Sequence, residues 1–430
     1  MNIDELIRDS LSEQAAAQQR PGPAFADRAL SIQRRRSSRA LASLAAATTI
    51  MVGLCVTVPT LDPVRNSASS PRDAPHPHFS QLNVPVPRPA QDASPLASLQ
   101  NSGDVIAHPD QSPPHDLIAA GRTALAAYYT VSIVKQNADE GVTRRTYRIL
   151  DQKTGTYRKD TRWSFVDVAP GMRTAAVLER NLPVKRIGLL DLLTGKIESW
   201  IPLDRGVASV AFSPDGGRLV ATTYATDPDL VFRQPDDADG DGQSNDWFPT
   251  ENGIVKTDQT KRTGFYILSL TSGRGSWSPA PSKSDRFGIV RRDFKFSADG
   301  KLVHTRRFTA PGGDQHYDFR GNKVAAPTKE KYTPSDLEAG LSPNGKLGAG
   351  SNVILDSRTG KQIHHIPGKR AIAWADNTRV IAWDSTSRNE FHNRLVLVPI
   401  DKDEILPLSG FLPGTEEQEP GRWTPLFAER

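Results

Sequence analysis

Hydrophobic positions form two different patterns along the chain. Residues 40–61 are an uninterrupted run without a charged side chain, whereas short apolar or alternating stretches recur through 117–430, separated by Gly, Asp, Asn and Pro. The first pattern has the length of a single helix across a bilayer, which needs about 20 residues. The second is typical of β-strands joined by tight turns. The sequence therefore predicts one transmembrane helix at 40–61 and an all-β domain at 117–430.

Charged residues around the apolar run predict its orientation. A cluster of arginines at 34–39 directly precedes the run, while Arg65 and Arg72 follow it beside Asp62 and Asp73. Because Lys and Arg are enriched on the cytoplasmic side of membrane helices, the N-terminus is expected in the cytoplasm and the C-terminal domain outside it. We expect a single-pass cell-membrane protein with an uncleaved signal-anchor.

A cleaved signal peptide is the competing interpretation of the apolar run. Its charged leader would be unusually long, and no Ala-x-Ala site ends the run. The segment 67–69, Ser-Ala-Ser, is a weak substitute for such a site. Cys55 suggests a lipoprotein, but Leu54 before it is larger than the small residue that lipoprotein sites need. Cys55 is better explained as a small apolar residue in lipid.

The two polar segments beside the anchor differ in composition. Residues 1–39 open with a capping box of Asn2 and Glu5 and a thin apolar stripe, which predicts either a solvated tail or a docking helix for a cytoplasmic partner. Residues 62–116 are dense in Pro, Ser, Ala and Asn, as in an extended disordered linker. Histidines in this linker, including His108 and His115, are not expected to bind a metal.

An internal repeat organises the predicted β domain. A turn followed by a strand reads FSPDGGRLVA at 212–221, FSADGKLV at 296–303 and LSPNGKL at 341–347, with weaker copies at 168–171 and 374–381. In such turns Pro favours φ near −65° and Gly accepts positive φ. A second hairpin reads ILDQKTG at 149–155, LLDLLTGKI at 189–197 and ILDSRTGKQI at 354–363, with looser copies at 268–273 and 398–403.

The spacing of the repeat predicts the architecture. Successive copies of the turn lie 44, 84, 45 and 32 residues apart. About 40–50 residues is the length of one four-stranded propeller blade, and the gap of 84 holds an insertion near 227–262. Since a single blade cannot bury its own faces, the units must close radially. We expect a β-propeller of about six blades, with seven as an alternative. A pair of β-sandwiches could use similar hairpins.

These turns resemble the WD40-like propeller repeats of the TolB type, over roughly residues 120–410. The resemblance is clear in three units and degraded in the others. The Gly-His and Trp-Asp pair of a true WD40 repeat is incomplete, because Trp383-Asp384 is the sole Trp-Asp and Gly-His is absent. The layout also resembles actinobacterial membrane-anchored propeller proteins, some of which are similar to companions of sigma factors. That resemblance implies a link to a cytoplasmic transcription factor.

Composition narrows the classes of function. The 430 residues include a single cysteine, so neither an intramolecular disulfide nor a cysteine-based zinc site is possible. The formal net charge of +5 is mild for this length, and the basic residues Lys261, Arg262, Arg291 and Arg292 fall in separate segments, where they are expected to be solvated. No nucleic-acid partner is therefore expected.

An acidic stretch at 236–246, DDADGDGQSND, is the most chemically suggestive part of the sequence. Alternating oxygen ligands Asp237, Asp239 and Asp241, a Gly for the sharp turn, and Asn245 at the ninth-position ligand have the spacing of a calcium-binding loop. Phe248 stands where such loops carry a bidentate Glu. A weak calcium site and a solvated acidic loop are both consistent with this pattern.

Catalytic motifs are missing from the sequence. It contains no Gly-x-Ser-x-Gly, His-Glu-x-x-His, Walker-type Gly-Lys-Ser/Thr or Gly-x-Gly-x-x-Gly. We therefore expect a non-enzymatic module that binds a protein or envelope ligand, and that could regulate a transcription factor through its N-terminal tail. The alternatives are an extracytoplasmic propeller enzyme, lactonase-like or glycan-cleaving with a central carboxylate or calcium site, and a structural role in the envelope.

Overall fold

The chain divides into two compact units, residues 1–72 and 73–430, and the described residues all belong to the second. The computed structural model describes residues 103–106, 108–138, 140–233, 247–248, 262–281, 291–305, 314–330, 332, 339–386, 389–402, 404–413 and 421–430. Every regular element in these ranges is a β-strand, which confirms the predicted all-β class there. None of these ranges holds a helix long and apolar enough to cross a membrane. The tail at 1–39 and the apolar run at 40–61 lie outside them.

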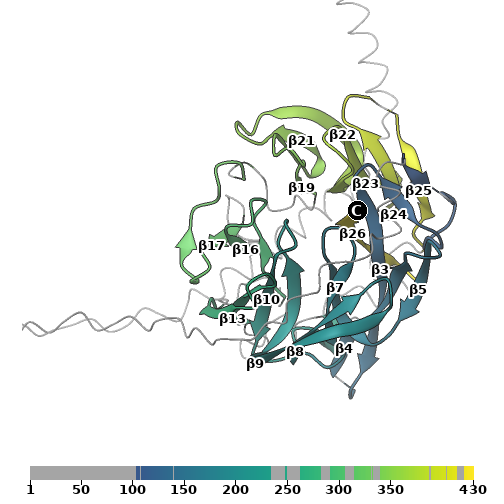
Figure 1. Cartoon of the computed structure of the whole chain (residues 1–430). Coiled ribbons are helices and arrows are strands. Elements are labelled where there is room, and N and C mark those ends of the chain that lie inside the picture. The colour runs from purple at the N-terminus through teal and green to yellow at the C-terminus, as the bar shows by residue number, and fades with distance from the viewer. Residues whose placement is uncertain are drawn as a thin grey trace, which may run out of the picture. The chain divides into compact units, whose positions relative to one another are not determined.

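Sheet A is assembled from both ends of the β domain. Its strands are β1 (Val105–Ile106), β2 (Ile118–Ala120), β3 (Thr123–Lys135), β4 (Glu140–Asp151), β5 (Thr156–Asp160), β11 (Leu230–Arg233), β12 (Trp247–Phe248) and β26 (Trp423–Glu429). The long β3–β4 hairpin forms its centre, and β5 extends it beyond β4. The last strand of the chain, β26, pairs antiparallel with β3 along its whole length (Figure 1). The C-terminus therefore completes the first sheet.

Sheet B contains two antiparallel meanders that share one long strand. Its strands are β6 (Trp163–Val168), β7 (Thr174–Glu179), β8 (Val184–Asp191), β9 (Lys196–Phe212), β10 (Arg218–Tyr224), β13 (Arg262–Ser269) and β14 (Gly275–Pro279). The first part of β9 pairs chiefly with β8, and its last part pairs with β10. The middle of β7, Ala175–Leu178, is buried on both faces, as expected for a strand inside packed sheets.

Sheets D and E continue the same antiparallel pattern. Sheet D contains β15 (Lys295–Phe296), β16 (Val303–Thr305), β17 (Gln315–Tyr317) and β18 (Lys323–Val324). Sheet E contains β19 (Gly340–Leu341), β20 (Leu347–Ala349), β21 (Ser351–Asp356), β22 (Gln362–Trp374), β23 (Arg379–Thr386), β24 (Asn389–Pro399) and β25 (Leu406–Phe411). As in sheet B, one long strand, β22, is shared: it pairs first with β21 and then with β23.

The repeated Ser-x-Asp/Asn-Gly turns have one hydrogen-bond pattern. In the turn before β10, the Ser213 hydroxyl accepts the N–H of Arg218 at 2.9 Å and donates to the Asp215 carboxylate. Ser297 does the same with Leu302 and Asp299, and Ser342 with Leu347 and Asn344. The Gly of each turn has φ near +68°, which side-chain-bearing residues rarely adopt. The predicted turn chemistry is therefore present in sheets B, D and E.

Sheet A contacts sheet B, sheet B contacts sheet D, and sheet E, the last along the chain, contacts sheet A. Buried side chains of sheets A and B, such as Tyr147 and Met172, share one hydrophobic cluster. Sheet B meets sheet D where the Phe294 N–H donates to Thr222 Oγ1 at 2.9 Å. In sheet A, Thr123 Oγ1 donates to the carbonyl of Trp374 in sheet E at 2.7 Å. The contact between the last sheet and the first is one that radially packed blades require.

Residues just before β2 pack against sheets A and E. These residues, within 103–116, fall in the segment that the sequence assigns to the linker. Asp104 Oδ2 pairs with Arg379 Nη1 at 2.5 Å, and the carbonyl of Gln111 accepts the N–H of Gly410 at 2.9 Å. Ser112 Oγ accepts the indole N–H of Trp423 at 3.0 Å. This part of the chain holds together the two sheets that meet at the ring closure.

Candidate functional site

The predicted calcium ligands Asp237, Asp239, Asp241 and Asn245 lie outside the described residues. The strands on either side of them are described: β11 and β12 pair through Phe232 with Phe248 and Arg233 with Trp247. β11 in turn pairs with the start of β4. Within the described ranges, no group of three or more His, Cys, Asp or Glu side chains could hold a metal ion. The calcium site stays a prediction.

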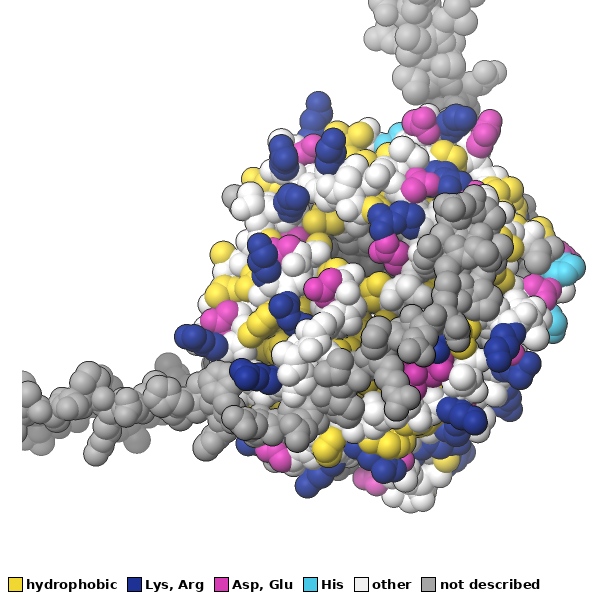
Figure 2. All heavy atoms as spheres, in the orientation of Figure 1, with side chains coloured by type: hydrophobic (Ala, Val, Ile, Leu, Met, Phe, Trp, Pro, Cys, Tyr) yellow, Lys and Arg dark blue, Asp and Glu magenta, His cyan; other side chains and the backbone are white. Residues whose placement is uncertain are grey.

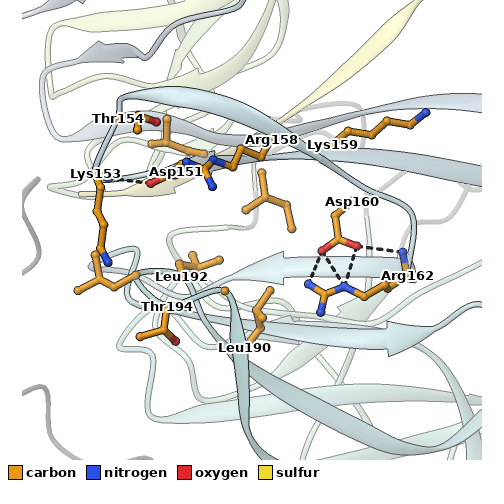
Figure 3. Close-up of a pocket in the computed structure, with 14 residues that line it drawn as sticks. Asp151, Lys153, Thr154, Arg158, Lys159, Asp160, Arg162, Leu190, Leu192 and Thr194 are labelled. Atoms are coloured by element: carbon orange, nitrogen blue, oxygen red, sulfur yellow. Dashed lines mark hydrogen bonds and ion pairs between the residues drawn. The ribbon is translucent and has the colours of Figure 1, made fainter.

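A pocket opens between two copies of the second repeated hairpin. It lies between the β4–β5 hairpin of sheet A and the β8–β9 hairpin of sheet B, and its volume is about 530 Å³ (Figure 3). Both turns use the Asp-x-x-Thr-Gly sequence: the N–H of Gly155 donates to the Asp151 carbonyl, and the N–H of Gly195 donates to the Asp191 carbonyl, each at 2.8 Å. Two turns with the same hydrogen bonds therefore form its two walls.

Apolar side chains from both hairpins form the floor of this pocket. Ile149 and Leu150 come from the end of β4, while Leu190, Leu192 and Leu193 come from the β8–β9 hairpin. Four of them are buried and belong to the hydrophobic cluster shared by sheets A and B: Ile149, Leu150, Leu190 and Leu192. A concave apolar surface with a few polar groups at its edge is the usual form of a small-molecule site.

The rim of the pocket is cationic. Its lining includes two lysines and two arginines but only two carboxylates, which leaves a formal charge of +2: Lys153, Arg158, Lys159, Arg162, Asp151 and Asp160. Figure 2 shows Lys and Arg side chains gathered at the lower right, where Figure 1 labels β4 and β5. An anionic ligand is therefore favoured over a cationic one.

Both carboxylates of the rim are already paired. Arg158 Nη2 lies 2.5 Å from Asp151 Oδ2. Arg162 donates through Nε and Nη2 to Asp160, which also accepts the indole N–H of Trp163 at 3.0 Å. Burial alone would raise the pKa of Asp160, but these hydrogen bonds from Arg162 and Trp163 lower it below its ordinary value. The positive charges of Arg158 and Arg162 therefore neutralise the carboxylates of Asp151 and Asp160.

The lysines of the rim have no carboxylate partner among the described residues. The side chain of Lys153 extends from its turn toward Leu192 and Thr194 on the opposite hairpin, whereas Lys159 points away from the leucines (Figure 3). Lys153 is thus the cation that faces both the apolar floor and the opposite wall.

A second cluster of charged groups is buried beneath the strands that join sheets A, B and D. Asp229 is 5% exposed, and its carboxylate accepts two hydrogen bonds from Arg145 at 2.6 and 3.0 Å and one from Arg291 at 2.6 Å. Arg291 Nε also lies 2.7 Å from Asp293 Oδ2, and Tyr224 donates to the other oxygen of Asp293. Burial raises the pKa of Asp229, but Arg291 and Arg145 outweigh it and hold that pKa below its ordinary value.

The burial of two arginines corrects one prediction from the sequence. Arg262 and Arg291 were expected to be solvated, yet Arg262 is 3% exposed and stacks 4.2 Å above the Phe294 ring. Arg262 Nε donates to the carbonyl of Ala280, and its Nη1 donates to Thr305 Oγ1. The prediction was wrong because spacing in the sequence does not show which strands meet. These guanidiniums connect sheets instead of facing solvent.

The sequence also did not predict the pocket, although it contained a signal for it. The lining comes from two segments about 40 residues apart, 149–162 and 190–195. Each segment carries the Asp-x-x-Thr-Gly hairpin that the repeat analysis had identified. What the repeat could not show is that these two copies lie against each other and leave a space between them.

Comparisons with known proteins give a likeness of fold. No family model matches the chain, and no curated protein matches it. Among solved structures, the chain is similar to TolB from Acinetobacter baumannii, with 17% identity and a TM-score of 0.32. The match covers 65% of this chain and 62% of the TolB chain, so this chain spans less than two thirds of TolB. It is also similar to the β-propeller domain of Myceliophteria thermophila Cps50 (Swd1), with 14% identity over 71% and 89% of the two chains and a TM-score of 0.34. The antiparallel sheets of the described residues agree with the predicted TolB-type and WD40-like propeller fold.

Proposed function

We propose that this chain is a membrane-anchored, extracytoplasmic β-propeller that acts as a binding module. The observation that carries the proposal is the preformed pocket between the first two blades, with an apolar floor and a cationic rim. Such a site binds through shape and charge and needs no catalytic group. The N-terminal 39 residues remain in the cytoplasm, where they meet a protein partner such as a transcription factor.

The proposed propeller has six blades. Four strands make each blade: β26–β3–β4–β5 in sheet A, two meanders in sheet B that share β9, the whole of sheet D, and two meanders in sheet E that share β22. The count of six supports the lower of the two blade numbers expected from the repeat. In the closing blade, the last strand, β26, pairs with β3 near the start of the β domain, which joins the two ends of the proposed ring.

Protease accessibility in intact cells tests the anchor and its orientation. A chain with an N-terminal epitope tag is expressed, and proteinase K is added to spheroplasts. We expect the β domain to be accessible while a tagged fragment containing residues 1–61 stays protected. Protection of the entire chain until the membrane is permeabilised would contradict the extracytoplasmic placement. Recovery of the domain in the soluble fraction would contradict the anchor.

Affinity capture tests the regulatory part of the proposal. The full chain is compared with a chain lacking residues 1–33, which keeps the whole arginine cluster and the apolar run. We expect a cytoplasmic transcription factor to be captured by the full chain alone. Capture of the same proteins by both chains would contradict a docking role for the tail and leave binding to the propeller.

A further inference from the structure

The pocket between the β4–β5 and β8–β9 hairpins has two chemically different ends. At one end, Lys153 and Thr194 approach from opposite hairpins (Figure 3). At the other, Arg162 is fixed by Asp160 at 2.6 Å and stacks 4.8 Å from the Trp163 ring. The floor between these ends is apolar. We propose that this pocket binds an amphiphilic anion, a small molecule with a carboxylate or phosphate head and a hydrocarbon body. This inference rests on the binding-module function and names the class of its ligand.

The head of the ligand is assigned to the Lys153 end. An ammonium attracts a carboxylate or phosphate as a compact point charge. The hydroxyl of Thr194 accepts the N–H of Lys196 at 3.4 Å, which leaves its proton available to a ligand oxygen. Asp151 does not compete for the Lys153 side chain, because its carboxylate is held by Arg158 and by the backbone N–H of Lys153. Lys153 and Thr194 therefore present a cation and a donor to one anionic group.

The body of the ligand is assigned to the floor. Burial of apolar area contributes roughly 25 cal/mol per Å². Leu193 is half-buried, and Ile149 and Leu192 keep small exposed parts, so the hydrocarbon part of a ligand would cover apolar area from two sheets. The volume of about 530 Å³ lies within the range of sites for small molecules. An anion without a hydrocarbon body would leave this floor in water.

A peptide is a poorer fit, because the nearby strand edge is already covered. Extended peptides usually bind by adding a strand to an open edge. The outer edge of β5 is covered at its start by residues just before β2: the N–H of Leu117 donates to the carbonyl of Gly155 at 2.8 Å, and the N–H of Tyr157 donates to that of His115 at 3.2 Å. Asp116 bridges to Thr156 between them. The pocket therefore does not continue into a peptide-binding groove at this place.

The test uses the full chain in nanodiscs of zwitterionic lipid, with empty nanodiscs as the blank. Isothermal titration calorimetry measures the binding of octyl phosphate, octanoate, octyltrimethylammonium and inorganic phosphate. We expect saturable binding of the first two, and weaker binding of inorganic phosphate by at least 10-fold. The cationic amphiphile is expected to show no binding above the blank. Equal binding of the cationic and anionic amphiphiles would overturn the proposal, as would equal binding of inorganic phosphate and octyl phosphate.

Two charge reversals locate the site. Lys153→Glu is expected to weaken octyl phosphate binding at least 10-fold, while Lys185→Glu, with the same change of charge at an exposed position of β8 outside the pocket lining, changes it less than 3-fold. Thr194→Val is expected to weaken it several-fold. Unchanged affinity in Lys153→Glu would overturn the assignment. If no amphiphile binds wild-type protein while the full chain still captures extracytoplasmic proteins, the ligand class is wrong and the binding-module function stands.

Discussion

The ring closure and sheet D use the same turn chemistry but differ in how the strands are held. At the closure, β26 pairs with β3 over the whole of Trp423–Glu429, and residues 103–116 add contacts to both flanking sheets. Sheet D has strands of two or three residues. Its turn, built on Ser297 and Asp299, nevertheless has the same hydrogen bonds as the turn of Ser213 and Asp215 in sheet B.

The difference shows that the repeat determines the turns, whereas strand length and aromatic packing determine how firmly a sheet is held. At the closure, Trp423 packs against Tyr128 and Trp383 with ring centroids 5.4 and 5.5 Å apart. Sheet D depends on aromatic contacts with its neighbour: the Phe294 and Phe265 rings lie 4.7 Å apart. We therefore expect the free energy of unfolding to depend most on the closure and least on the outer strand of sheet D.

Deletion of residues 422–430 is expected to have the largest effect. It removes β26, which exposes the paired edge of β3 and the aromatic cluster around Trp423. We expect the full chain in detergent to lose its cooperative urea transition, as followed by tryptophan fluorescence. The control is a chain extended by a tag after Arg430, which should unfold like wild type.

A matched change in sheet D measures the contrast. Replacement of Lys323 and Val324 by Gly weakens β18, the outer strand of that sheet, and should lower the free energy of unfolding by roughly 1–2 kcal/mol. Equal losses from the deletion and from this double substitution would show that the closure has no special role.

Asp229→Ala is expected to have the next largest effect, because Asp229 joins sheet A to the residues that lead into sheet D. The change leaves Arg145 buried without its carboxylate and leaves Arg291 with Asp293 as its acidic partner. Breaking a buried ion pair by removing one partner costs about 3–5 kcal/mol. Equilibrium urea unfolding measures this loss, with Asp160→Ala at the exposed Arg162 pair as a control expected to cost less. A loss below that of the control would contradict a structural role for the cluster.

Asp167→Asn is expected to have a smaller effect that depends on pH. Asp167 accepts the N–H of Phe212 at 2.7 Å, and burial raises the pKa of Asp167 to about 6, against an ordinary value near 4. Between those values the folded chain keeps a proton that the unfolded chain releases, so the free energy of unfolding falls as pH rises from about 4 to 6. Above pH 6 the Asn variant should be more stable than wild type, on the order of 1–2 kcal/mol.

Urea titrations at several pH values measure this effect. The gap between wild type and Asp167→Asn should close as the pH falls toward 4. A gap of the same size at pH 4 and pH 7 would contradict the assignment to Asp167. Asp227, whose pKa is also raised to about 6 by burial, stays in both chains and adds the same slope to each.

Removal of one turn hydroxyl is expected to have the smallest effect. Ser213→Ala and Ser297→Ala each remove a buried side chain that accepts a backbone N–H and donates to a carboxylate. We expect both to cost about 1 kcal/mol. Since the two turns have the same bonds, the two losses should agree within about 0.5 kcal/mol. A much larger loss at Ser213 would show that the turn depends on its sheet.

Local patterns in the sequence predicted the strands and turns but not the contacts between distant segments. Stretch 128–134 falls within β3, stretch 395–400 falls within β24 except for its last residue, and both repeated turns have the expected glycine geometry. The pairing of β26 with β3 depends on residues about 300 positions apart, for which no pattern of period two gives a signal. The same holds for the Arg145–Asp229–Arg291 cluster and the pocket, whose groups come together only when neighbouring sheets pack.

The central structural claim is that the C-terminal strand closes the propeller, and a disulfide trap tests it most directly. Ala124 and Ala428 are both buried and lie opposite each other in the β3–β26 register, at a separation that a disulfide can bridge. Ala124→Cys and Ala428→Cys are combined with Cys55→Ser, oxidised, and digested for mass spectrometry. The account predicts that the peptides containing the two new cysteines are recovered linked in most molecules. Two free thiols that react fully only after denaturation would contradict it.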